Sequence, residues 1–489
     1  MTDLSALFEA ALAPHAEAPL YRRLYGCLRD AVLEGRLSPG ERLPSSRTLA
    51  ASLGCSRNTV MEAFDLLRAE GYLEGRTGAG SFVSTNFSDG WVREAATRDK
   101  ADRTLPAPRI SRTGRALLSM GAGAAGDVAP HVPDPGGPDL SAFPFDIWAR
   151  TLSRVWRRPD LDIVTRGDPM GYRPLRAAIA DYLQKVRALR CGADRVMIVS
   201  GAQHGLDLVV RMLIDPGGPV WIEDPSYRGA RAALLAAGAK AVPVPVGSEG
   251  FDTARGTKLE PTARVALVTP SHQFPLGVTM SLPHRMELLE WAEDNGGWIV
   301  EDDFDSEFRY SGRPIPALHG LDRAERVIYV GTFSKAMFPS LRLGYVVLPE
   351  SIVPAFRAAR VLLDGHTTTV SQLALAEFFA EGQFTAHLRR MRALYRERRD
   401  AMRDAVQARL SSYLDGEPGE GGMHLLAHLR AGLDDVAISR RAREAGIACP
   451  ALSSYYTGPG KRQGLVIGFA GTDIKTIPLL VERLAAVMA

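Results

Sequence analysis

Apolar residues near the start of the chain recur at the spacing of amphipathic helices. The stretch PLYRRLYGCLRDAVLEGRL is predicted to be a helix because of the spacing of Leu20, Leu24, Leu28, Val32 and Leu33. The stretch SPGERLP breaks this helix. A short helix is then expected over SSRTLAASLG, with a serine to cap its start and Gly54 to end it.

The next stretch, CSRNTVMEAFDLLRAEGYL, predicts a second short helix. Ser56 is the expected N-cap, Gly71 ends the helix, and the buried stripe comprises Val60, Phe64 and Leu67. Two short helices separated by a glycine turn indicate a helix-turn-helix, whose second helix normally enters the DNA major groove by its N-terminal end.

The start of this second helix carries hydrogen-bonding side chains suited to base edges and phosphates, namely Ser56, Arg57, Asn58 and Thr59. The following YLEGRTGAGSFV predicts a hairpin whose tip, from Arg76 to Gly80, would place an arginine near the minor groove. A fold without DNA binding stays open, because residues 1–85 hold nine Arg, no Lys and ten acidic residues.

The rest of the chain divides into two regions that differ in composition. Residues 86–130 are mixed in charge and rich in Arg, Ala, Gly and Pro, which predicts a linker between a first domain, 1–85, and a second, 131–489. From 131 onward, short apolar runs alternate with Ala/Leu/Arg helices: RVMIVS, PVWIED, RVALVTP, GGWIVEDD and RVIYVGT. Continuous apolar strands between helices predict an α/β fold with a mostly parallel sheet covered on both faces.

Composition and net charge indicate where in the cell the protein is located, but not what it binds. The chain of 489 residues carries a net charge of +3, so any DNA contact must come from placed residues rather than from a global polycation. Four scattered cysteines, without a CxxC pair, argue against a disulfide framework or zinc site. Without a signal peptide or an apolar run long enough to span a bilayer, the protein is expected to be cytoplasmic.

One lysine stands where a Schiff base with pyridoxal phosphate would need it. Lys335 follows a buried-type strand in YVGTFSKAMFPSLRLGY, with Thr332 before it and Arg342 seven residues after it. Such a cofactor also needs a carboxylate for its pyridine nitrogen, an aromatic plane, and donors for its phosphate. A lone lysine is usually a solvated charge, but the strand, hydroxyls and arginine here favour the cofactor.

Candidates for the remaining roles lie after other apolar strands. Asp302, in GGWIVEDDFDSEFRY, is the candidate partner of the pyridine nitrogen, with metal binding or a helix-capping acid cluster as alternatives. The helix start SGAQHG, with Ala202 and Gln203, is the candidate phosphate loop. Tyr227, in WIEDPSYRGAR, would stack on the ring, although such a tyrosine is more often a core residue.

The stretch from LSPGERLP to GAGSFV resembles the winged helix-turn-helix of the GntR superfamily over its whole length. By that resemblance, Arg47, Arg57 and Thr59 fall at positions that contact phosphates and bases, while Gly78 and Gly80 shape the wing.

Residues from about 131 resemble a fold-type I aminotransferase, which implies a mixed, mostly parallel sheet with helices on both faces. The whole chain resembles the MocR/GabR family. PDLSAFPFDIWAR, GDPMGYRPLR, TPSHQFPLG, EDDFDSEFRY and GTFSKAMFPSLRLGY carry this resemblance. It implies pyridoxal phosphate on Lys335, with Asp302 at the pyridine nitrogen and Tyr227 on the ring. The phosphate would be held by Ala202, Gln203, Thr332 and Arg342, and the phenolic oxygen would lie near His272 or Gln273.

Three positions depart from the family pattern. Phe304 stands where a tyrosine usually donates to the phenolic oxygen, and Val466 stands where aminotransferases carry an arginine that grips the substrate carboxylate. Arg166 replaces a common tyrosine. These differences argue against an ordinary amino-acid aminotransferase.

The leading hypothesis is therefore a DNA-binding regulator, not an enzyme, whose aminotransferase-like domain senses an amine, an amino acid or pyridoxal phosphate itself. The resemblance also implies a homodimer, with each reader domain crossing to the partner. The alternatives are an active aminotransferase with an accessory domain, and a dimerisation module that holds no cofactor.

Overall fold

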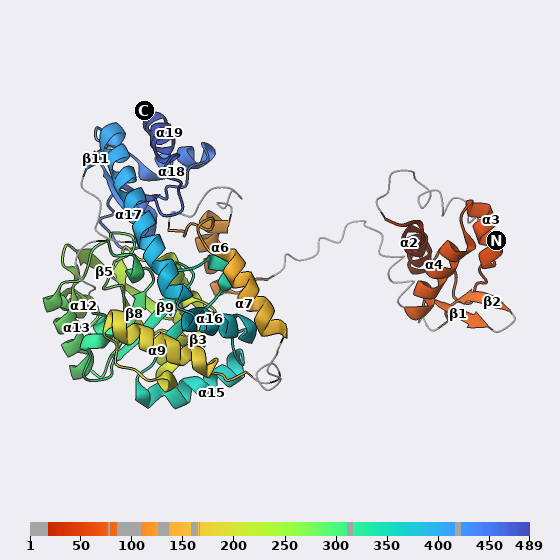
Figure 1. Cartoon of the computed structure of the whole chain (residues 1–489), viewed down its shortest axis with the longest axis horizontal. Coiled ribbons are helices and arrows are strands. Elements are labelled where there is room, and N and C mark those ends of the chain that lie inside the picture. The colour runs from red at the N-terminus through yellow and green to blue at the C-terminus, as the bar shows by residue number, and fades with distance from the viewer. Residues whose placement is uncertain are drawn as a thin grey trace. The chain divides into compact units, whose positions relative to one another are not determined.

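In the computed structural model, the described residues are 18–76, 79–85, 109–125, 136–157, 165, 167–310, 316–415 and 422–489. They form two compact units, divided between Arg109 and Ile110 (Figure 1). Each unit has its own buried apolar core.

The described residues of the N-terminal unit form three helices and a two-stranded sheet: α2 (Leu20–Leu33), α3 (Ser46–Leu53), α4 (Arg57–Ala69), β1 (Leu73–Arg76) and β2 (Gly80–Val83). The two strands pair antiparallel, with Leu73 opposite Val83. The order of helices and hairpin is that of a winged helix-turn-helix, as predicted.

Serine caps start the last two helices of this unit. The Ser45 side chain accepts from the backbone N–H of Thr48 at the start of α3, and that of Ser56 accepts from Thr59 at the start of α4. Gly54 ends α3 in the left-handed conformation that glycine favours.

The predicted buried stripe of α4 is confirmed, because Val60, Phe64 and Leu67 lie in the core of this unit. In α2 the apolar spacing predicts the burial of one residue wrongly. Leu24, Leu28 and Val32 are buried, but the neighbouring Leu33 projects toward solvent at the end of the helix.

The C-terminal unit is built on an eight-stranded sheet. Its order is β3-β10-β9-β8-β7-β4-β5-β6. The strands are β3 (Val196–Val199), β4 (Pro219–Asp224), β5 (Lys240–Gly247), β6 (Gly250–Phe251), β7 (Val265–Val268), β8 (Trp298–Asp303), β9 (Val327–Thr332) and β10 (Gly344–Val347). All five predicted apolar runs are strands. The sheet is mixed because β10 pairs antiparallel with both β3 and β9, and β6 pairs antiparallel with β5.

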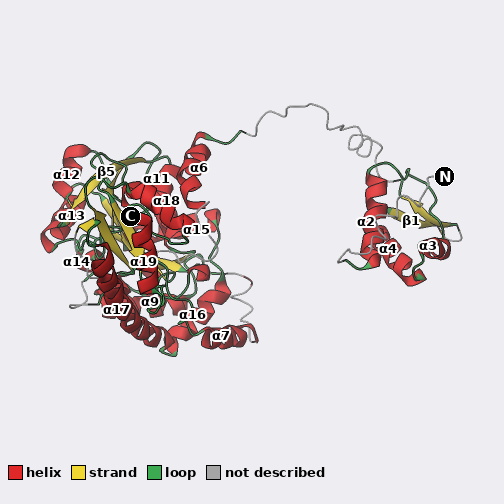
Figure 2. Ribbon diagram, turned by 90° about the horizontal axis from the view of Figure 1, so that it is seen from above, coloured by secondary structure: helices red, strands yellow, loops and turns green. Residues whose placement is uncertain are grey.

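Helices surround this sheet (Figure 2). They are α7 (Phe145–Arg157), α9 (Arg173–Arg187), α10 (Ala202–Leu213), α11 (Arg228–Ala236), α12 (Thr253–Leu259), α13 (Leu282–Asp294), α14 (Leu318–Leu321), α15 (Val353–Leu363) and α16 (Thr369–Ala380). Alternate strand residues face opposite ways. Val300 packs with α10 and α11, whereas its neighbour Ile299 packs with α13.

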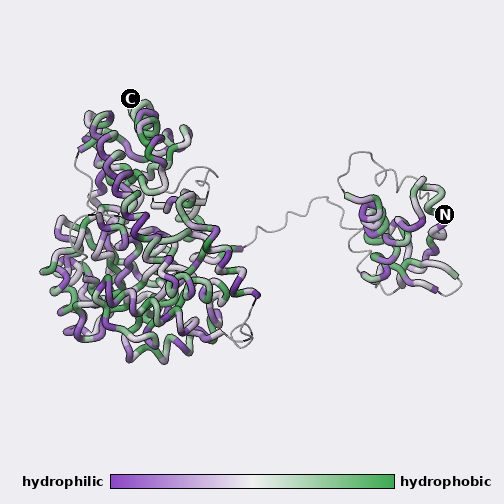
Figure 3. The backbone as a smooth tube through the Cα atoms, in the orientation of Figure 1, coloured by the Kyte–Doolittle hydropathy of each residue, from purple (hydrophilic) through white to green (hydrophobic). Residues whose placement is uncertain are grey.

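A smaller antiparallel sheet follows, formed by β11 (Leu414–Asp415), β12 (His424–Leu429) and β13 (Gly464–Gly468). It packs with α17 (Gln383–Leu410), α18 (Asp435–Glu444) and α19 (Ile477–Met488). Hydrophobic and hydrophilic residues alternate along these helices and along those of the N-terminal unit (Figure 3).

The segment predicted as a linker holds one helix. Helix α6 (Arg112–Ala125) packs against α11, so the C-terminal unit begins about twenty residues earlier than the predicted boundary at 131. Its sequence, RTGRALLSMGAGAA, has too few large apolar residues to give a helical period by eye, but Ala and Leu favour helix strongly.

Among the described residues, no helix is long and apolar enough to cross a membrane.

Candidate functional site

The predicted cofactor residues gather at one edge of the large sheet. Strands β3, β7, β8, β9 and β4 run in the same direction, so their carboxyl ends lie together. The segments that follow them carry the candidates: Asp302 and Thr332 at the ends of β8 and β9, and Ala202, Gln203, Tyr227, His272, Gln273 and Lys335 just beyond strands. Ligands of open α/β sheets bind at this edge.

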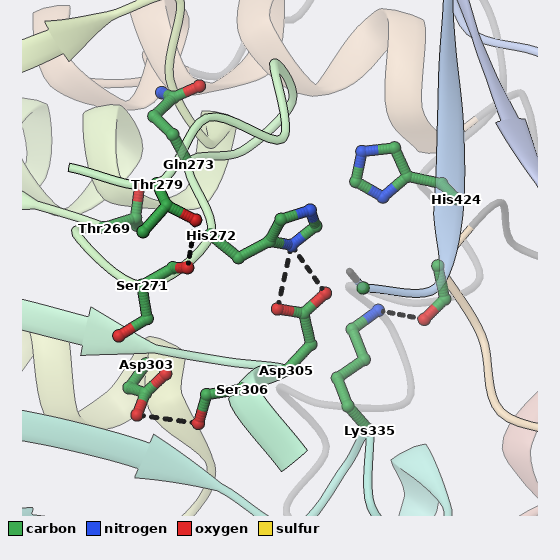
Figure 4. Close-up of polar contacts among 12 residues, drawn as sticks. Thr269, Ser271, His272, Gln273, Thr279, Asp303, Asp305, Ser306, Lys335 and His424 are labelled. Carbon is green, nitrogen blue, oxygen red and sulfur yellow. Dashed lines mark hydrogen bonds and ion pairs between the residues drawn. The ribbon is translucent and has the colours of Figure 1, made fainter. Parts of the chain in front are cut away.

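Lys335 reaches the site from the loop after β9. Its Nζ donates a hydrogen bond to the backbone carbonyl oxygen of Gly136 at 2.7 Å. A Cβ added at position 136 would lie 3.2 Å from the same nitrogen, so this segment runs close against the lysine. In Figure 4, the lysine extends beside Asp305 and His272. Sequence reasoning did not identify Gly136, because a glycine-rich stretch predicts only a turn.

Asp302 is buried, and one of its carboxylate oxygens has no hydrogen-bond partner. It is 5% exposed, and no described residue donates to its Oδ1. Burial, and then the charges of Asp303, Glu223 and Asp305, raise the pKa of Asp302 to about 7. A buried carboxylate among other acids lacks a cationic partner, which a protonated pyridine nitrogen would supply. Among the described residues, no cluster of His, Cys, Asp or Glu suits a metal ion.

The neighbouring carboxylate, Asp303, belongs to the scaffold. It accepts from Nε of Arg187 at 2.9 Å and from the hydroxyl groups of Ser306 and Tyr329. Arg187 also donates to Ser271 in the loop after β7. This network joins α9, β8 and β9 beneath the site and leaves Asp302 as the free acid of the pair.

The predicted phosphate end lies at the start of α10. Gly201 precedes this helix with φ of +89°, and a Cβ added to it would lie 3.5 Å from Nη1 of Arg342. The guanidinium therefore lies against the helix N-terminus, where free N–H groups and the helix dipole also favour an anion. Thr332 lies at the same edge, and its Oγ1 accepts from the backbone N–H of Ser334.

Two candidates have local partners of their own. Gln203 donates from Nε2 to the carbonyl oxygen of Gly229 at 2.9 Å, so its side chain turns toward α11 while its backbone stays at the helix start. Tyr227 is the N-cap residue of α11, and its ring is 41% exposed. That exposure is more than a core tyrosine would have, and it leaves a face for a cofactor ring.

His272 and Gln273 were alternatives for the phenolic oxygen, and their side chains have different partners in the structure. Gln273 donates from Nε2 to Pro225 and Glu223, and its Oε1 accepts from the backbone N–H of Leu276, so its amide holds the loop together. His272 remains, with Nδ1 3.0 Å from both carboxylate oxygens of Asp305 (Figure 4). Burial lowers the pKa of His272, but Asp305 outweighs burial and the net shift is upward.

The three residues that depart from the family pattern differ in their surroundings. Phe304 is half-buried, with its ring centroid 5.8 Å from that of Phe274. Val466 lies on β13, buried among Leu426, Leu452 and Tyr455. Arg166 lies outside the described residues.

The candidate DNA contacts lie mostly at the surface of the N-terminal unit. Arg47, Ser56, Arg57 and Asn58 are exposed, and Thr59 is half-buried. The hydroxyl of Ser56 is used in the cap of α4, so its side chain has a structural role as well.

In the wing, Arg76 pairs with Glu74 at 2.7 Å and lies over the ring of Phe82. Gly80 has a φ of +113°, and the guanidinium of Arg42 lies near it. Gly78 lies outside the described residues.

Comparisons with known proteins match both units. Residues 20–83 match the gntR family of bacterial regulatory proteins, and residues 162–484 match aminotransferase class I and II. MocR of Rhizobium meliloti, described as a probable rhizopine catabolism regulatory protein, is 40% identical over 94% of this chain and 92% of its own length. The pyridoxine biosynthesis regulator PdxR of Corynebacterium glutamicum is 31% identical over 96% of this chain and 95% of its own length.

Solved aminotransferases share the fold of the C-terminal unit. LysN from Thermus thermophilus, an α-aminoadipate aminotransferase complexed with N-(5'-phosphopyridoxyl)-L-leucine, is 30% identical with a TM-score of 0.67. The similarity covers 77% of this chain and 94% of that one. A kynurenine aminotransferase from Pyrococcus horikoshii is 29% identical, with a TM-score of 0.68. The similarity covers 78% of this chain and 95% of that one.

This fold implies pyridoxal phosphate, and the residues present suit it. The unpartnered oxygen of Asp302 matches a protonated pyridine nitrogen, and Arg342 at the start of α10 matches a phosphate. Because the regulators named above match nearly the whole chain, reader domain included, the chain belongs to the MocR/GabR family of helix-turn-helix transcription regulators.

Proposed function

We propose that this regulator holds pyridoxal phosphate on Lys335 and uses it to sense a small molecule, which changes the affinity of the N-terminal unit for operator DNA. The observation that carries the proposal is the buried, unpartnered carboxylate oxygen of Asp302 at the same sheet edge as Lys335. Burial of an acid without a partner is unfavourable, and such a residue fits a binding role better than a structural one.

Each residue then has a task that its position suits. Asp302 keeps the pyridine nitrogen protonated, Arg342 and the start of α10 hold the phosphate, and Tyr227 covers the ring. Lys335, whose Nζ donates to the carbonyl oxygen of Gly136, would hold the cofactor through that nitrogen. When bound, the cofactor supplies an aldehyde carbon that combines reversibly with amines, together with a visible absorbance band.

A sensing role is favoured over steady transamination by Val466. A buried valine cannot grip a carboxylate in the bidentate way an arginine does. The rival function, an active aminotransferase with an accessory domain, shares the same fold, so only turnover separates the two.

The proposal includes a homodimer that binds double-stranded DNA through both N-terminal units. Three consecutive apolar residues at the end of α15, Val361, Leu362 and Leu363, are exposed, and a surface of this kind is typical of a subunit contact. In the reader, Arg47, Arg57, Asn58 and Arg76 would contact DNA, with Gly78 and Gly80 shaping the wing.

The test is an absorbance titration of the purified protein with amines, amino acids and pyridoxal phosphate, with DNA binding followed by anisotropy. The probe is a labelled fragment of the region upstream of its own gene. We expect a visible band in the wild type that is lost in Lys335→Ala, and a ligand that changes both band and DNA affinity without release of product.

Arg57→Ala is the matched control, since it should lose DNA binding and keep the band. Repeated turnover with a keto acid and no effect on DNA would show an enzyme instead. If no visible band forms in the wild type, the protein is a module without a cofactor.

A further inference from the structure

One side of the candidate cofactor site is a wall of aromatic rings centred on Phe274. The centroid of its ring lies 6.4 Å from Tyr227, 5.8 Å from Phe304, 5.3 Å from His424 and 5.2 Å from Tyr455. We call these five residues the aromatic wall. The rings of Tyr227, Phe274 and Phe304 are partly exposed, so a ligand can reach them.

An apolar cluster backs this wall. Leu426, Leu452, Tyr455 and Val466 are buried together, and Phe274 packs against them. Val466 is 1% exposed, so the position where aminotransferases carry an arginine is sealed inside the cluster. The cluster that backs the wall therefore contains no charged residue.

The wall lies close to the reactive lysine. The pKa of His424 is lowered to about 4 by burial first, and the charge of Lys335 contributes to that shift. Figure 4 shows His424 on β12 facing His272, with Lys335 extending toward the same region. The rings of these two histidines have centroids 5.6 Å apart.

Three side chains around the wall that could carry a positive charge, His424, His272 and Arg228, lie in settings that do not favour a carboxylate. His424 is neutral at physiological pH, because its pKa lies near 4. His272 already faces both oxygens of Asp305. Arg228 lies over the face of Tyr455, 5.1 Å from its centroid.

The floor of the site adds negative charge. Asp302 and Asp305 are buried there. A ligand carboxylate pressed between these acids and an apolar wall would lose its hydration without gaining a partner. An apolar or aromatic group would instead gain contact with the rings.

From this geometry we infer that the ligand of the site is a primary amine with an apolar or aromatic body and no carboxylate on the carbon that bears the nitrogen. The inference rests on the proposed cofactor at Lys335, and it narrows the sensed molecule from amines and amino acids in general to apolar amines. Phe274 is the residue that we assign as the main determinant of this specificity.

The experiment compares pairs of compounds that differ only in the carboxylate. Protein saturated with pyridoxal phosphate is titrated with phenethylamine against phenylalanine, and with 3-methylbutylamine against leucine, while the visible band is followed. We expect each amine to bind at least about tenfold more tightly than its amino acid, because an unpaired buried carboxylate costs more than one factor of ten in affinity.

Variants then locate the preference. Phe274→Ala should weaken phenethylamine about tenfold, as expected for the loss of a large aromatic contact, while methylamine binding stays nearly unchanged. Trp298→Ala is the matched control, since this half-buried aromatic residue begins β8 at the opposite end from Asp302. This control variant should bind phenethylamine and methylamine as tightly as the wild type does.

Arg228→Gln tests the guanidinium that lies over the ring of Tyr455. If the amino acids bind more tightly than the amines, and Arg228→Gln removes that advantage, the inference is overturned and Arg228 is the carboxylate clamp. The inference also fails if neither class shifts the band. In both cases a Lys335-dependent band would leave the proposed function standing, whereas absence of the band in the wild type would remove the proposed function itself.

Discussion

Asp302→Asn should make the cofactor-free protein more stable at pH 8, although it removes a residue that we place in the binding site. The pKa of Asp302 is about 7 in the folded protein, mainly through burial, against about 3.9 for an unfolded aspartate. Because the folded value is the higher one, stability is greatest below the unfolded pKa. It falls as the pH rises toward 7, where the folded carboxyl group finally ionises.

The magnitude follows from the shift. About three pKa units at about 1.36 kcal/mol each give roughly 4 kcal/mol of destabilisation at pH 8, as an upper value. Asparagine cannot ionise, so it removes this penalty. With an unfolding entropy of about 2.1 cal/mol/K per residue, a unit of this size should melt roughly 5 °C higher.

The assay is thermal unfolding of cofactor-free wild type and variant from pH 5 to pH 8. The gain of Asp302→Asn should shrink to less than half at pH 5, where much of the penalty has disappeared. Asp294→Asn, at the exposed end of α13, is the matched control and should show no gain. With pyridoxal phosphate the order should reverse, since only the wild type offers the carboxylate. A variant less stable than wild type at pH 8 without cofactor, or a gain independent of pH, would refute this account of Asp302.

Three further changes test the scaffold. Phe64→Ala should cost about 3–5 kcal/mol in the core of the N-terminal unit and abolish DNA binding measured by anisotropy, with the visible band unchanged. Ser56→Ala should cost about 1 kcal/mol through loss of the α4 cap, seen as a lower melting point of that unit by circular dichroism, whereas Ser52→Ala should not. Arg187→Met should cost about 3–5 kcal/mol in denaturant unfolding, because it leaves Asp303 buried without its cation, and Arg187→Met with Asp303→Leu should recover much of the loss.

The fold was largely predictable from the sequence because its signals are local. Serine caps, glycine stops and the Val60, Phe64 and Leu67 stripe define the helix-turn-helix. The five apolar runs form strands because continuous apolar runs are typical of a sheet buried on both faces. The antiparallel β10 was not predictable in this way, since the direction of a short apolar strand leaves no mark in its composition.

The site was predictable as a set of residues but not as a set of contacts. Lys335 and Asp302 could be proposed from the sequence because each ends or follows a strand. The partners that define their chemistry come from far along the chain. Gly136 approaches Lys335 across about two hundred residues, and His424 reaches the site from the smaller sheet. Sequence spacing also could not decide between His272 and Gln273, because that depends on which side chain the loop uses for its own bonds.

The adjacency of Asp302 and Asp303 limits how this chain can change. Consecutive residues of a strand project to opposite faces, so Asp302 faces the candidate site and Asp303 faces the Arg187 network. Deletion or insertion of a single codon within β8 would exchange the two faces, and would damage recognition and folding in the same event. Natural variants of this regulator should therefore tolerate point substitutions around the pair, while codon insertions and deletions are confined to the loops on either side of β8.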